Sequence, residues 1–589
     1  MTGDASKMAV KGVEPAGKMV VQPFNYKGIV LEDGRLRRQF DEVREYYLRI
    51  PNDDLLYGYR KRTGLPAPGK ELGGWYTGDA GNVFPQIISG FARMYAATGD
   101  PGCLEKANYL ISEWAKCIAP DGYFFYSTHP TSRQYFYEKM VSALIDMYVY
   151  CDNKDTLGYL SRITDWAEKN LNCTRDYANA CGDPKQEHHA WGEWYTVSES
   201  LYRAYLVTGD ARYRDFAEVW EYKEYWDLFA KKADIFGVRE NGQQTLVYHA
   251  YSHVNTFSSA AAAYLAKGEL HYLDVLRNAY DYLQSNQVYA TGGYGPNEEL
   301  IPNDRFANSL VDAPNHCEAQ CGSWAGFKMC KYLISFTGDA KYGDWIERMV
   351  YNLIGADLPM AADGRVFYYA HYHLKGAEKK LYPDGWACCT GTRPQAVADY
   401  HDLIYFKDSD SLYVNLYTPS KVEWGSVTVQ QSTLFPEDDV ARFTISSKQP
   451  AAFSINLRVS SWLAGEMTAK VNGEPVYLKT GNDHWAVINR VWKNGDELTV
   501  NLPMNLWLKP LTTSKRFPAV IMYGPVALAA RSLDGYPAGK VDFDNLEKVL
   551  IPSPGEPLTF HLASDYNVLF RPFYAFMEGE QYFLYLDPD

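Results

Sequence analysis

Hydrophobic side chains recur every three to four residues through roughly the first 360 positions of this chain and at every second residue after about Gly364. The first spacing is typical of amphipathic helices and the second of half-buried strands. Residues 32–50 illustrate the helical part, with Leu36, Phe40, Val43 and Tyr47 on one side. The pattern therefore predicts a helical region followed by an all-β region.

A short turn sequence repeats along the helical part. Thr-Gly-Asp occurs at 98–100, 208–210 and 337–339, Lys-Gly-Glu at 267–269, and a divergent Asp-Asn-Lys-Asp at 152–155. These turns lie 54, 56, 59 and 70 residues apart. Glycine or asparagine suits the left-handed position that ends a helix, and the next residues can begin another. Each interval fits one helical hairpin, so the repeat predicts an array of hairpins.

Such an array can be an open solenoid or a closed ring. The segments at the end opposite to the repeated turns are long, aromatic and polar, unlike solenoid linkers, and loops on one face of a rigid scaffold are where sites are built. We therefore expect an (α/α)6–7 toroid. The expected divisions are an N-terminal lead over 1–30, the toroid over 31–360, a connection carrying Cys388 and Cys389 over 361–410, and β-sandwich-like regions over 411–589.

The β region is marked by alternation and by turn signals. Asn472-Gly473 and Asn494-Gly495 are typical of tight hairpins. One helical piece is expected at 394–405. Strands are expected at 365–371, 411–417, 422–430, 441–447, 453–459, 470–476, 485–491 and 497–502.

Composition narrows the classes of partner. The net charge of −14 argues against a nucleic acid or an anionic membrane surface, and no run of about 18 apolar residues predicts membrane insertion. No apolar signal core opens the chain, so we expect a periplasmic or cytoplasmic protein and leave its oligomeric state open. Ten cysteines in 589 residues do not make a disulfide scaffold.

Aromatic residues are unusually abundant at 15%, with 48 Tyr and 15 Trp. Their flat apolar faces and polar tips suit sugar rings. This favours an oligosaccharide or polysaccharide substrate, although a large aromatic core is the alternative.

Two clusters carry candidate chemistry. Cys388 and Cys389 are adjacent, and Glu318 and Cys321 lie about seventy residues upstream. If the clusters meet, they form a four-ligand set of the kind that Zn²⁺ takes. The alternative is that these cysteines are small buried hydrophobic residues.

Other side chains are candidates for catalysis or substrate binding. Glu298 and Glu299 lie in a tight Gly/Pro loop and could supply a general acid or remain solvated charge. His249 and His253 are four residues apart, without the glutamate of a metalloprotease motif, so substrate hydrogen bonding or core filling is favoured over metal binding. His188 has the same alternatives as His249 and His253. Lys139, Arg305 and Arg393 could bind a substrate carboxylate, although a lone basic residue more often forms a salt bridge. Tyr294 is a further candidate for substrate contact.

The order of these motifs resembles a known family. Thr291-Gly-Gly-Tyr-Gly, the Glu298-Glu299 pair, Glu318 with Cys321, and Cys388-Cys389 are similar to glycoside hydrolase families 127 and 146, the β-L-arabinofuranosidase group. The resemblance implies an (α/α)6 barrel with β-sandwich domains and a zinc ion held by one Glu and three Cys. It also implies that Cys388 is the nucleophile and that Glu298 or Glu299 is the acid/base.

Three departures from the family pattern suggest a diverged member. Two residues separate Glu318 from Cys321 where the family has one, Trp386 stands where a third cysteine is common, and Lys139 replaces a histidine. They suggest a substrate that carries a negative charge.

The leading expectation is an exo-acting enzyme that removes a terminal sugar from a plant-type glycan by retaining hydrolysis. One alternative is a polysaccharide lyase that releases a terminal sugar such as rhamnose from a 4-linked uronate by β-elimination. Another is a non-catalytic glycan-binding protein with a structural metal.

Overall fold

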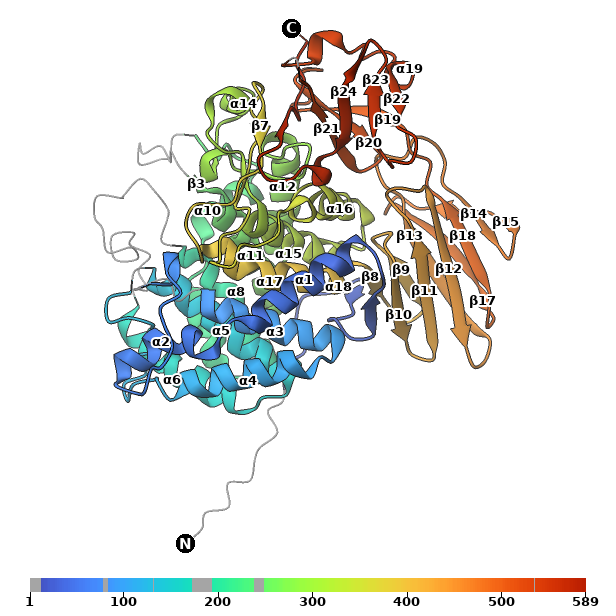
Figure 1. Cartoon of the computed structure of the whole chain (residues 1–589). Helices are drawn as coiled ribbons and strands as arrows, with labels where there is room; N and C mark the ends of the chain where they lie inside the picture. The colour runs from blue at the N-terminus through green and yellow to red at the C-terminus, as the bar shows by residue number, and fades with distance from the viewer. Residues whose placement is uncertain are drawn as a thin grey trace.

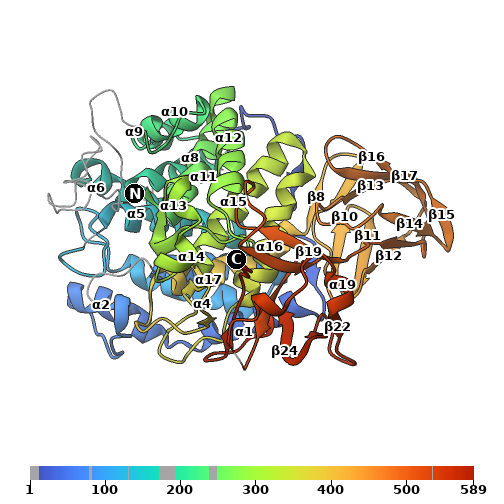
Figure 2. The same cartoon turned by 90° about the horizontal axis from the view of Figure 1, so that it is seen from above.

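The computed structural model describes residues 12–77, 83–130, 132–171, 193–237, 248–533 and 535–588. Helices gather in one body, and sheets follow it along the chain in two further bodies (Figures 1 and 2). The predicted mainly α toroid followed by β-sandwich-like regions is confirmed. Across the described ranges, no helix combines the length and apolarity needed to cross a bilayer.

Six inner helices close a ring within the described part of the chain. Each packs against the next, and the last packs against the first. Most side chains of these helices are buried, because each helix touches ring neighbours on two sides and an outer helix on a third. In ring order they are α3 (Val83–Thr98), α5 (Arg133–Cys151), α8 (Val197–Thr208), α11 (Ala250–Lys267), α15 (Ala319–Thr337) and α17 (Cys388–Ala398).

An outer helix accompanies each inner one. The first outer helix, α1, buries Leu36, Phe40, Val43 and Tyr47 in the amphipathic pattern expected for residues 32–50. It packs against α17, so the sixth hairpin joins the two ends of the helical region. The ring thus runs on through α17, past the expected boundary at 360. The outer helices are α1 (Arg35–Arg49), α4 (Pro101–Ala115), α6 (Asp155–Asn170), α9 (Ala211–Val219), α12 (Leu270–Asn286) and α16 (Gly343–Asn352).

The repeated turns end the inner helices as predicted. Gly99, Gly209, Gly268 and Gly338 adopt φ between 70° and 74°, and Asp152 takes the same left-handed region at the divergent copy. The aspartates that follow three of the glycines accept hydrogen bonds from the backbone N–H two residues on, which caps the next helix.

At the other end of the ring, two short antiparallel pairs tie the loops together. β3 (Tyr248–His249) pairs with β4 (Glu299–Leu300), and β5 (Cys317–Glu318) pairs with β6 (Tyr369–Ala370). β3 and β5 lead directly into α11 and α15, so the residues at these helix starts are held in register with two later loops. The other α-helices of this region are α2 (Asn52–Thr63), α10 (Lys223–Ala230), α13 (Asn303–Phe306), α14 (Ser309–Asp312) and α18 (Tyr400–Leu403).

Two sheets face each other beside the ring. Their orders are β1-β8-β9-β13-β17-β16 and β15-β14-β18-β12-β11-β10-β2, and Trp424 of one packs edge-on against Phe453 of the other at 5.3 Å. The strands are β1 (Gln22–Pro23), β2 (Ile29–Leu31), β8 (Tyr405–Lys407), β9 (Ser411–Val414), β10 (Ser420–Trp424), β11 (Val427–Thr433), β12 (Val440–Ser447), β13 (Ala451–Arg458), β14 (Thr468–Val471), β15 (Glu474–Val476), β16 (Lys479–Thr480), β17 (Trp485–Trp492) and β18 (Glu497–Asn501).

Two of the expected strands are hairpins. The segment 422–430 turns at Gly425, whose φ of 61° separates β10 from β11. The segment 470–476 turns at Asn472-Gly473, where the predicted hairpin signal lies. The helix expected at 394–405 begins earlier, at Cys388.

The third sheet has the order β19-β20-β21-β24-β23-β22 and its own small core around Leu528 and Phe570. It packs on the ring through contacts of β21 with α16. Its strands are β19 (Leu506–Pro510), β20 (Ala519–Tyr523), β21 (Val526–Arg531), β22 (Leu550–Pro552), β23 (Phe560–Leu562) and β24 (Asp565–Pro572); β25 (Gln581–Tyr582) pairs with β7 (Ala377–Glu378), and α19 (Leu546–Val549) precedes β22.

Residues 13–21, here called the N-terminal strap, cross the ring at the end of the repeated turns. Val13 N–H donates to Leu206 O at 2.9 Å, Ala16 N–H to Leu265 O at 2.8 Å and Val20 N–H to Ser335 O at 2.7 Å. The strap therefore satisfies carbonyls at the C-termini of α8, α11 and α15 that the helices cannot pair themselves.

A buried lysine marks the contact between the ring and the third sheet. Lys379 is fully buried; its ammonium donates to Ala356 O at 2.6 Å and lies 4.6 Å from the ring centre of Phe573. Burial lowers the pKa of Lys379 to about 7.

This shift makes stability depend on pH in one direction. The unfolded chain keeps the Lys379 proton up to about pH 10, whereas the folded protein releases it near pH 7, so the unfolded state binds more protons between these values. From pH 7 to 10 we expect Lys379 to add roughly 3 kcal/mol to the free energy of unfolding. Denaturant unfolding at both pH values tests this: between pH 7 and 10, the free energy of unfolding should change by roughly 3 kcal/mol more in the stabilising direction in the wild type than in Lys379→Met. Equal changes in the two proteins would contradict it.

Candidate active site

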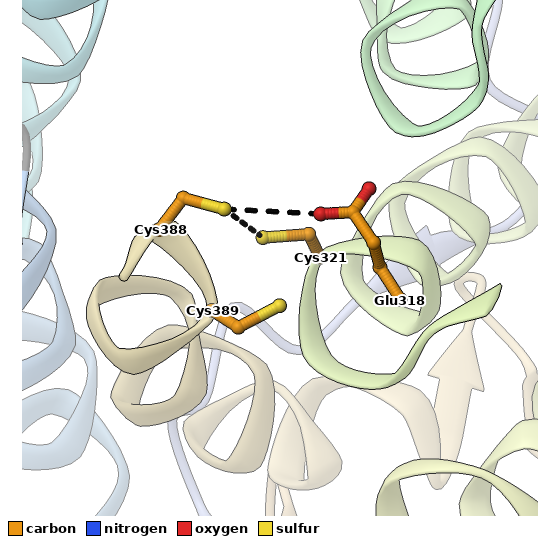
Figure 3. Close-up of side chains that lie close together, drawn as sticks. All are labelled: Glu318, Cys321, Cys388 and Cys389. Carbon is orange, nitrogen blue, oxygen red and sulfur yellow. Dashed lines mark hydrogen bonds between the residues drawn. The ribbon is translucent and has the colours of Figure 1, made fainter. Parts of the chain in front are cut away.

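The two sulfur-and-acid clusters lie together at one end of the ring (Figure 3). One ligand atom from each of Glu318, Cys321, Cys388 and Cys389 can be chosen so that all four lie within 4.8 Å of one another. Cys388 Sγ is 3.6 Å from Cys321 Sγ and 3.8 Å from Glu318 Oε1. Figure 3 shows the side chains of Cys388 and Glu318 directed toward each other. The four residues form a possible metal-binding group.

Helix starts position all four side chains. Glu318 is the N-cap of α15 and Cys321 lies in its first turn, while Cys388 and Cys389 open α17, the next helix in the ring. The positive end of a helix dipole favours anions, so both helices favour the thiolate forms. Glu318 and Cys321 are three residues apart and so lie on one side of the first turn of α15. The spacing by two intervening residues therefore still lets both side chains reach the same metal-binding group.

The thiols differ in access. Cys321 and Cys389 are buried and Cys388 is partly exposed. The hydrogen bond with Cys321 raises the pKa of Cys388, and burial raises the pKa of Cys321 and Cys389. The hydroxyl of Tyr368 is 3.1 Å from Cys388 Sγ. A bound cation would favour the thiolates that burial opposes.

Glu298 lies beside this group in a strained turn. Asn297 and Glu298 have φ of 55° and 62°, a region that non-glycine residues seldom adopt. The turn directs the Glu298 carboxylate to the hydroxyl of Tyr369, which donates a short hydrogen bond to it. Strain of this kind gathers at functional sites.

His249 joins Glu298 to the metal-binding group. Its Nε2 is 3.6 Å from Glu298 Oε2 and 3.9 Å from Glu318 Oε2, and its Nδ1 is 3.4 Å from Glu193 Oε1. Although burial opposes it, the hydrogen bond with Glu298, together with the nearby charges of Glu193 and Glu318, raises the pKa of His249 to about 9. The imidazolium is thus favoured among three carboxylates.

The pKa values of the three glutamates around His249 are shifted in different directions. Burial works to raise the pKa of Glu298, but the hydrogen bond with His249, the charge of His249 and the hydrogen bonds with Tyr369 and Tyr368 together lower that pKa below its usual range. Burial raises the pKa of Glu318 to about 8 and that of Glu193 to about 7. The site therefore separates acids of different strength within one cluster.

Glu299 occupies a different position from Glu298. It begins β4, where its backbone lies opposite His249 in the β3–β4 pair. Glu298 precedes this strand, in the left-handed turn, and its carboxylate reaches the Tyr369 hydroxyl and His249 Nε2.

Two other predicted residues are packed within the protein. His253 lies among Tyr195, Tyr225 and Tyr248, and burial lowers its pKa to about 3, which corresponds to the core-filling alternative. Tyr294 is buried behind the cluster and its hydroxyl donates to Gly322 O at 3.2 Å. It supports the first turn of α15.

Lys139 lies inside the ring. It is buried, its ammonium is 2.8 Å from Glu138 Oε2, and it donates to the hydroxyl of Tyr251 at 3.2 Å. It also lies 5.2 Å from the ring centre of Trp324, one turn along α15 from Cys321. The ion pair with Glu138 already neutralises its charge.

The two predicted arginines are not directed at the cluster. Arg393 is buried and forms a short ion pair with Asp357. Its guanidinium therefore already has a carboxylate partner within the protein. Arg305 is exposed on the four-residue helix α13. His188 lies outside the described residues.

Three residues that contact the candidate site were not predicted from the sequence. Tyr368 and Tyr369 lie in a segment recognised only as a strand, and Thr392, whose hydroxyl is 3.2 Å from Cys321 Sγ, was passed over inside the cysteine motif. The Tyr-Tyr pair carried a signal, because adjacent strand residues face opposite ways and can serve two neighbouring groups at once.

The chain matches two family models. One describes the catalytic domain of GH127 β-L-arabinofuranosidases and covers residues 29–402. The other describes the middle domain of the same enzymes and covers residues 411–504. The first match includes the ring and all four members of the possible metal-binding group.

Individual relatives are more distant. The chain is 22% identical to the non-reducing end β-L-arabinofuranosidase of Bifidobacterium longum subsp. longum over 53% of its own length, and spans about half (50%) of that relative. A solved GH127 β-arabinofuranosidase superposes with a TM-score of 0.74 at 17% identity, covering 97% of this chain and 98% of that one.

A GH127 β-L-arabinofuranosidase from Geobacillus stearothermophilus T6 superposes with a TM-score of 0.69 at 19% identity, covering 95% of this chain and 99% of that one. At these identities the superpositions establish the shared fold, while the family models cover most of the sequence. The chain belongs to the GH127 β-L-arabinofuranosidase family of glycoside hydrolases.

Proposed function

We propose that this protein is an exo-acting glycoside hydrolase that removes a terminal β-L-arabinofuranosyl-type sugar from plant glycans with retention of configuration. The observation that carries the proposal is the position of Cys388, the partly exposed member of a group of one glutamate and three cysteines. It lies at the same end of the ring as Glu298, in a chain matched by the GH127 catalytic-domain model.

The chemistry would proceed by double displacement. The Cys388 thiolate attacks the anomeric carbon and forms a carbon–sulfur bond as the glycosidic bond breaks. Glu298, which receives a proton from the neighbouring His249 imidazolium, gives that proton to the departing oxygen. Glu298 then takes a proton from water, whose oxygen attacks the same carbon and breaks the carbon–sulfur bond. The thiolate and the protonated Glu298 are regenerated, so atoms and charges balance over the cycle.

The residues around Glu298 would set its two roles. Tyr369 and His249 hold the carboxylate in place, and Glu193 holds the other nitrogen of His249. Tyr368 donates toward the Cys388 sulfur and would stabilise its thiolate. Positioning of reacting groups by such contacts supplies a large share of catalysis.

We assign the metal-binding group to zinc on its donor set. Three sulfurs and one carboxylate oxygen suit zinc, and the 3.6 Å between Cys321 and Cys388 sulfurs is close to the ~3.8 Å edge of a tetrahedron with ~2.3 Å zinc–sulfur bonds. When bound, zinc would keep Cys388 as a thiolate.

Metal content gives a direct prediction. Purified wild-type protein should hold about one zinc per chain, and Cys389→Ser should lose most of it because a buried sulfur of the cluster is removed. Mass spectrometry of the metal measures this, and thermal unfolding should show that chelation lowers the melting temperature by several degrees. Cys151→Ser, outside the cluster, should keep its zinc; equal zinc in the two variants would refute the ligand set.

Two competing functions can be separated from hydrolysis in one assay. Digestion of an arabinogalactan or arabinan with the wild type should release free L-arabinose without new absorbance near 235 nm. Rising absorbance would indicate a lyase, which the family assignment does not favour, and binding without release would indicate a glycan-binding protein.

The stereochemistry of hydrolysis is tested separately. Proton magnetic resonance during cleavage of a synthetic β-L-arabinofuranoside should show the β-anomer of arabinose first. Initial release of the α-anomer would overturn the proposed chemistry.

A further inference from the structure

Aromatic rings continue outward from Glu298. Tyr369, which donates to Glu298, lies 5.7 Å from Tyr382, and Tyr382 lies 6.1 Å from Trp75, all between ring centres and edge to face. Tyr368 underlies them, 4.8 Å from Tyr382 and 6.2 Å from Trp75. We call Tyr369, Tyr382 and Trp75 the aromatic string.

The aromatic string is most exposed at Trp75, the end that lies furthest along the string from Glu298. Tyr369 and Tyr382 are half-buried, and Trp75 is 37% exposed, the most exposed tryptophan among those the structure describes. A single exposed ring is ordinary by itself. Trp75 differs because it ends a line of aromatic rings that begins at Glu298.

Trp75 is nevertheless held firmly. Its backbone N–H donates to Gly385 O at 3.0 Å, three residues before Cys388. The chain at Gly74 has a φ of 53° and passes so close to the Gly385 carbonyl that a side chain at Gly74 would collide with it. An exposed ring on a fixed turn is preorganised for contact with a ligand.

The proposed chemistry fixes where the departing group lies. Cys388 attacks one side of the anomeric carbon, and Glu298 protonates the oxygen that leaves from the other side. The rest of the glycan must therefore extend from Glu298, which is where the aromatic string begins.

We propose that the aromatic string binds the leaving part of the glycan, with Tyr382 beneath the first sugar and Trp75 beneath the second. The ring centres are 5.7 and 6.1 Å apart, and the planes of Tyr382 and Trp75 lie at 89° to each other, so the two rings offer their flat faces to different sugar units. Aromatic faces pack well on sugar rings. The preferred substrate class is then a terminal sugar carried on an oligosaccharide of at least two further residues. This inference rests on the proposed function of the same site.

Binding energy from distant sugars would be used in the transition state and would raise kcat/KM. The test compares methyl β-L-arabinofuranoside with the same sugar carried on an arabino-oligosaccharide of two further residues. In Trp75→Ala and Trp75→Leu, the ratio of kcat/KM for the oligosaccharide to that for the methyl glycoside should fall about tenfold. Trp75→Tyr, which keeps a flat face, should retain most of the ratio.

Tyr477→Ala is the matched control, because Tyr477 is 88% exposed at the far β-sandwich; its ratio should equal that of the wild type. Equal losses on both substrates in Trp75→Ala and Trp75→Leu would overturn the inference and leave Trp75 a structural residue. A wild type that cleaves both substrates equally well would also overturn it while leaving the hydrolase function intact. Release of sugar from neither substrate would overturn both.

Discussion

Replacing Cys388 by serine is expected to lower kcat/KM for release of the terminal sugar by about 10⁴-fold or more. A serine hydroxyl stays protonated where a metal-bound thiol is ionised, and it is the weaker nucleophile at this carbon. Cys388 is the partly exposed member of its group, whereas Cys321 and Cys389 are buried. Initial rates on a β-L-arabinofuranoside, measured together with metal content, test the prediction.

A trapping experiment separates attack from metal binding. A mechanism-based arabinofuranosyl inactivator should label the peptide that holds Cys388 and Cys389, and fragmentation should place the adduct on Cys388. Cys151→Ser, changed at a half-buried thiol at the end of α5, should keep full activity. An adduct on Cys389, or a zinc-loaded Cys388→Ser protein with more than a few per cent of wild-type activity, would rule out Cys388 as the nucleophile.

Glu298→Gln should lower kcat by about 10²- to 10⁴-fold, while Glu299→Gln should change it by less than a few fold. The two residues are adjacent, and the Glu298 carboxylate accepts a hydrogen bond from Tyr369 and lies 3.6 Å from His249 Nε2. The glutamine keeps the shape and loses the proton, so the deficit should shrink for an activated leaving group such as nitrophenol, which needs little protonation. Azide should restore turnover in Glu298→Gln by replacing the water that needs a base.

The pair of variants is its own control. Loss of activity in Glu299→Gln with normal activity in Glu298→Gln would assign the acid/base role to the other residue. Equal losses in both, without leaving-group dependence, would point to a disturbed loop instead of missing acid catalysis.

Local rules were sufficient to predict much of the ring. The glycines at 99, 209, 268 and 338 take the left-handed conformation that the repeated turn requires, and the aspartates that follow three of them cap helices. Such signals act within a few residues, so a single sequence carries them. A closed ring was predicted, but the helices that form its sixth hairpin, α1 and α17, were not, because they pair across some 340 residues without a repeated turn.

The site was predictable in its chemistry and less so in its details. A carboxylate and thiols offered at helix starts indicate a metal-binding group, and the structure brings them together. The choice between Glu298 and Glu299 depends on backbone angles at Asn297 and Glu298. The ion pair between Arg393 of α17 and Asp357, which lies 36 residues earlier in the chain, cannot be predicted from the residues around Arg393 either.

The N-terminal strap carries a consequence for biosynthesis. The strap is synthesised before the segments that receive it, because the carbonyls that accept its hydrogen bonds belong to Leu206, Leu265 and Ser335, and the adjoining β2 pairs with residues 420–422 of β10. Vectorial synthesis favours early folding of early segments. Residues 13–31 must instead stay undocked until helices and a strand some 190 to 390 residues further along the chain have been translated.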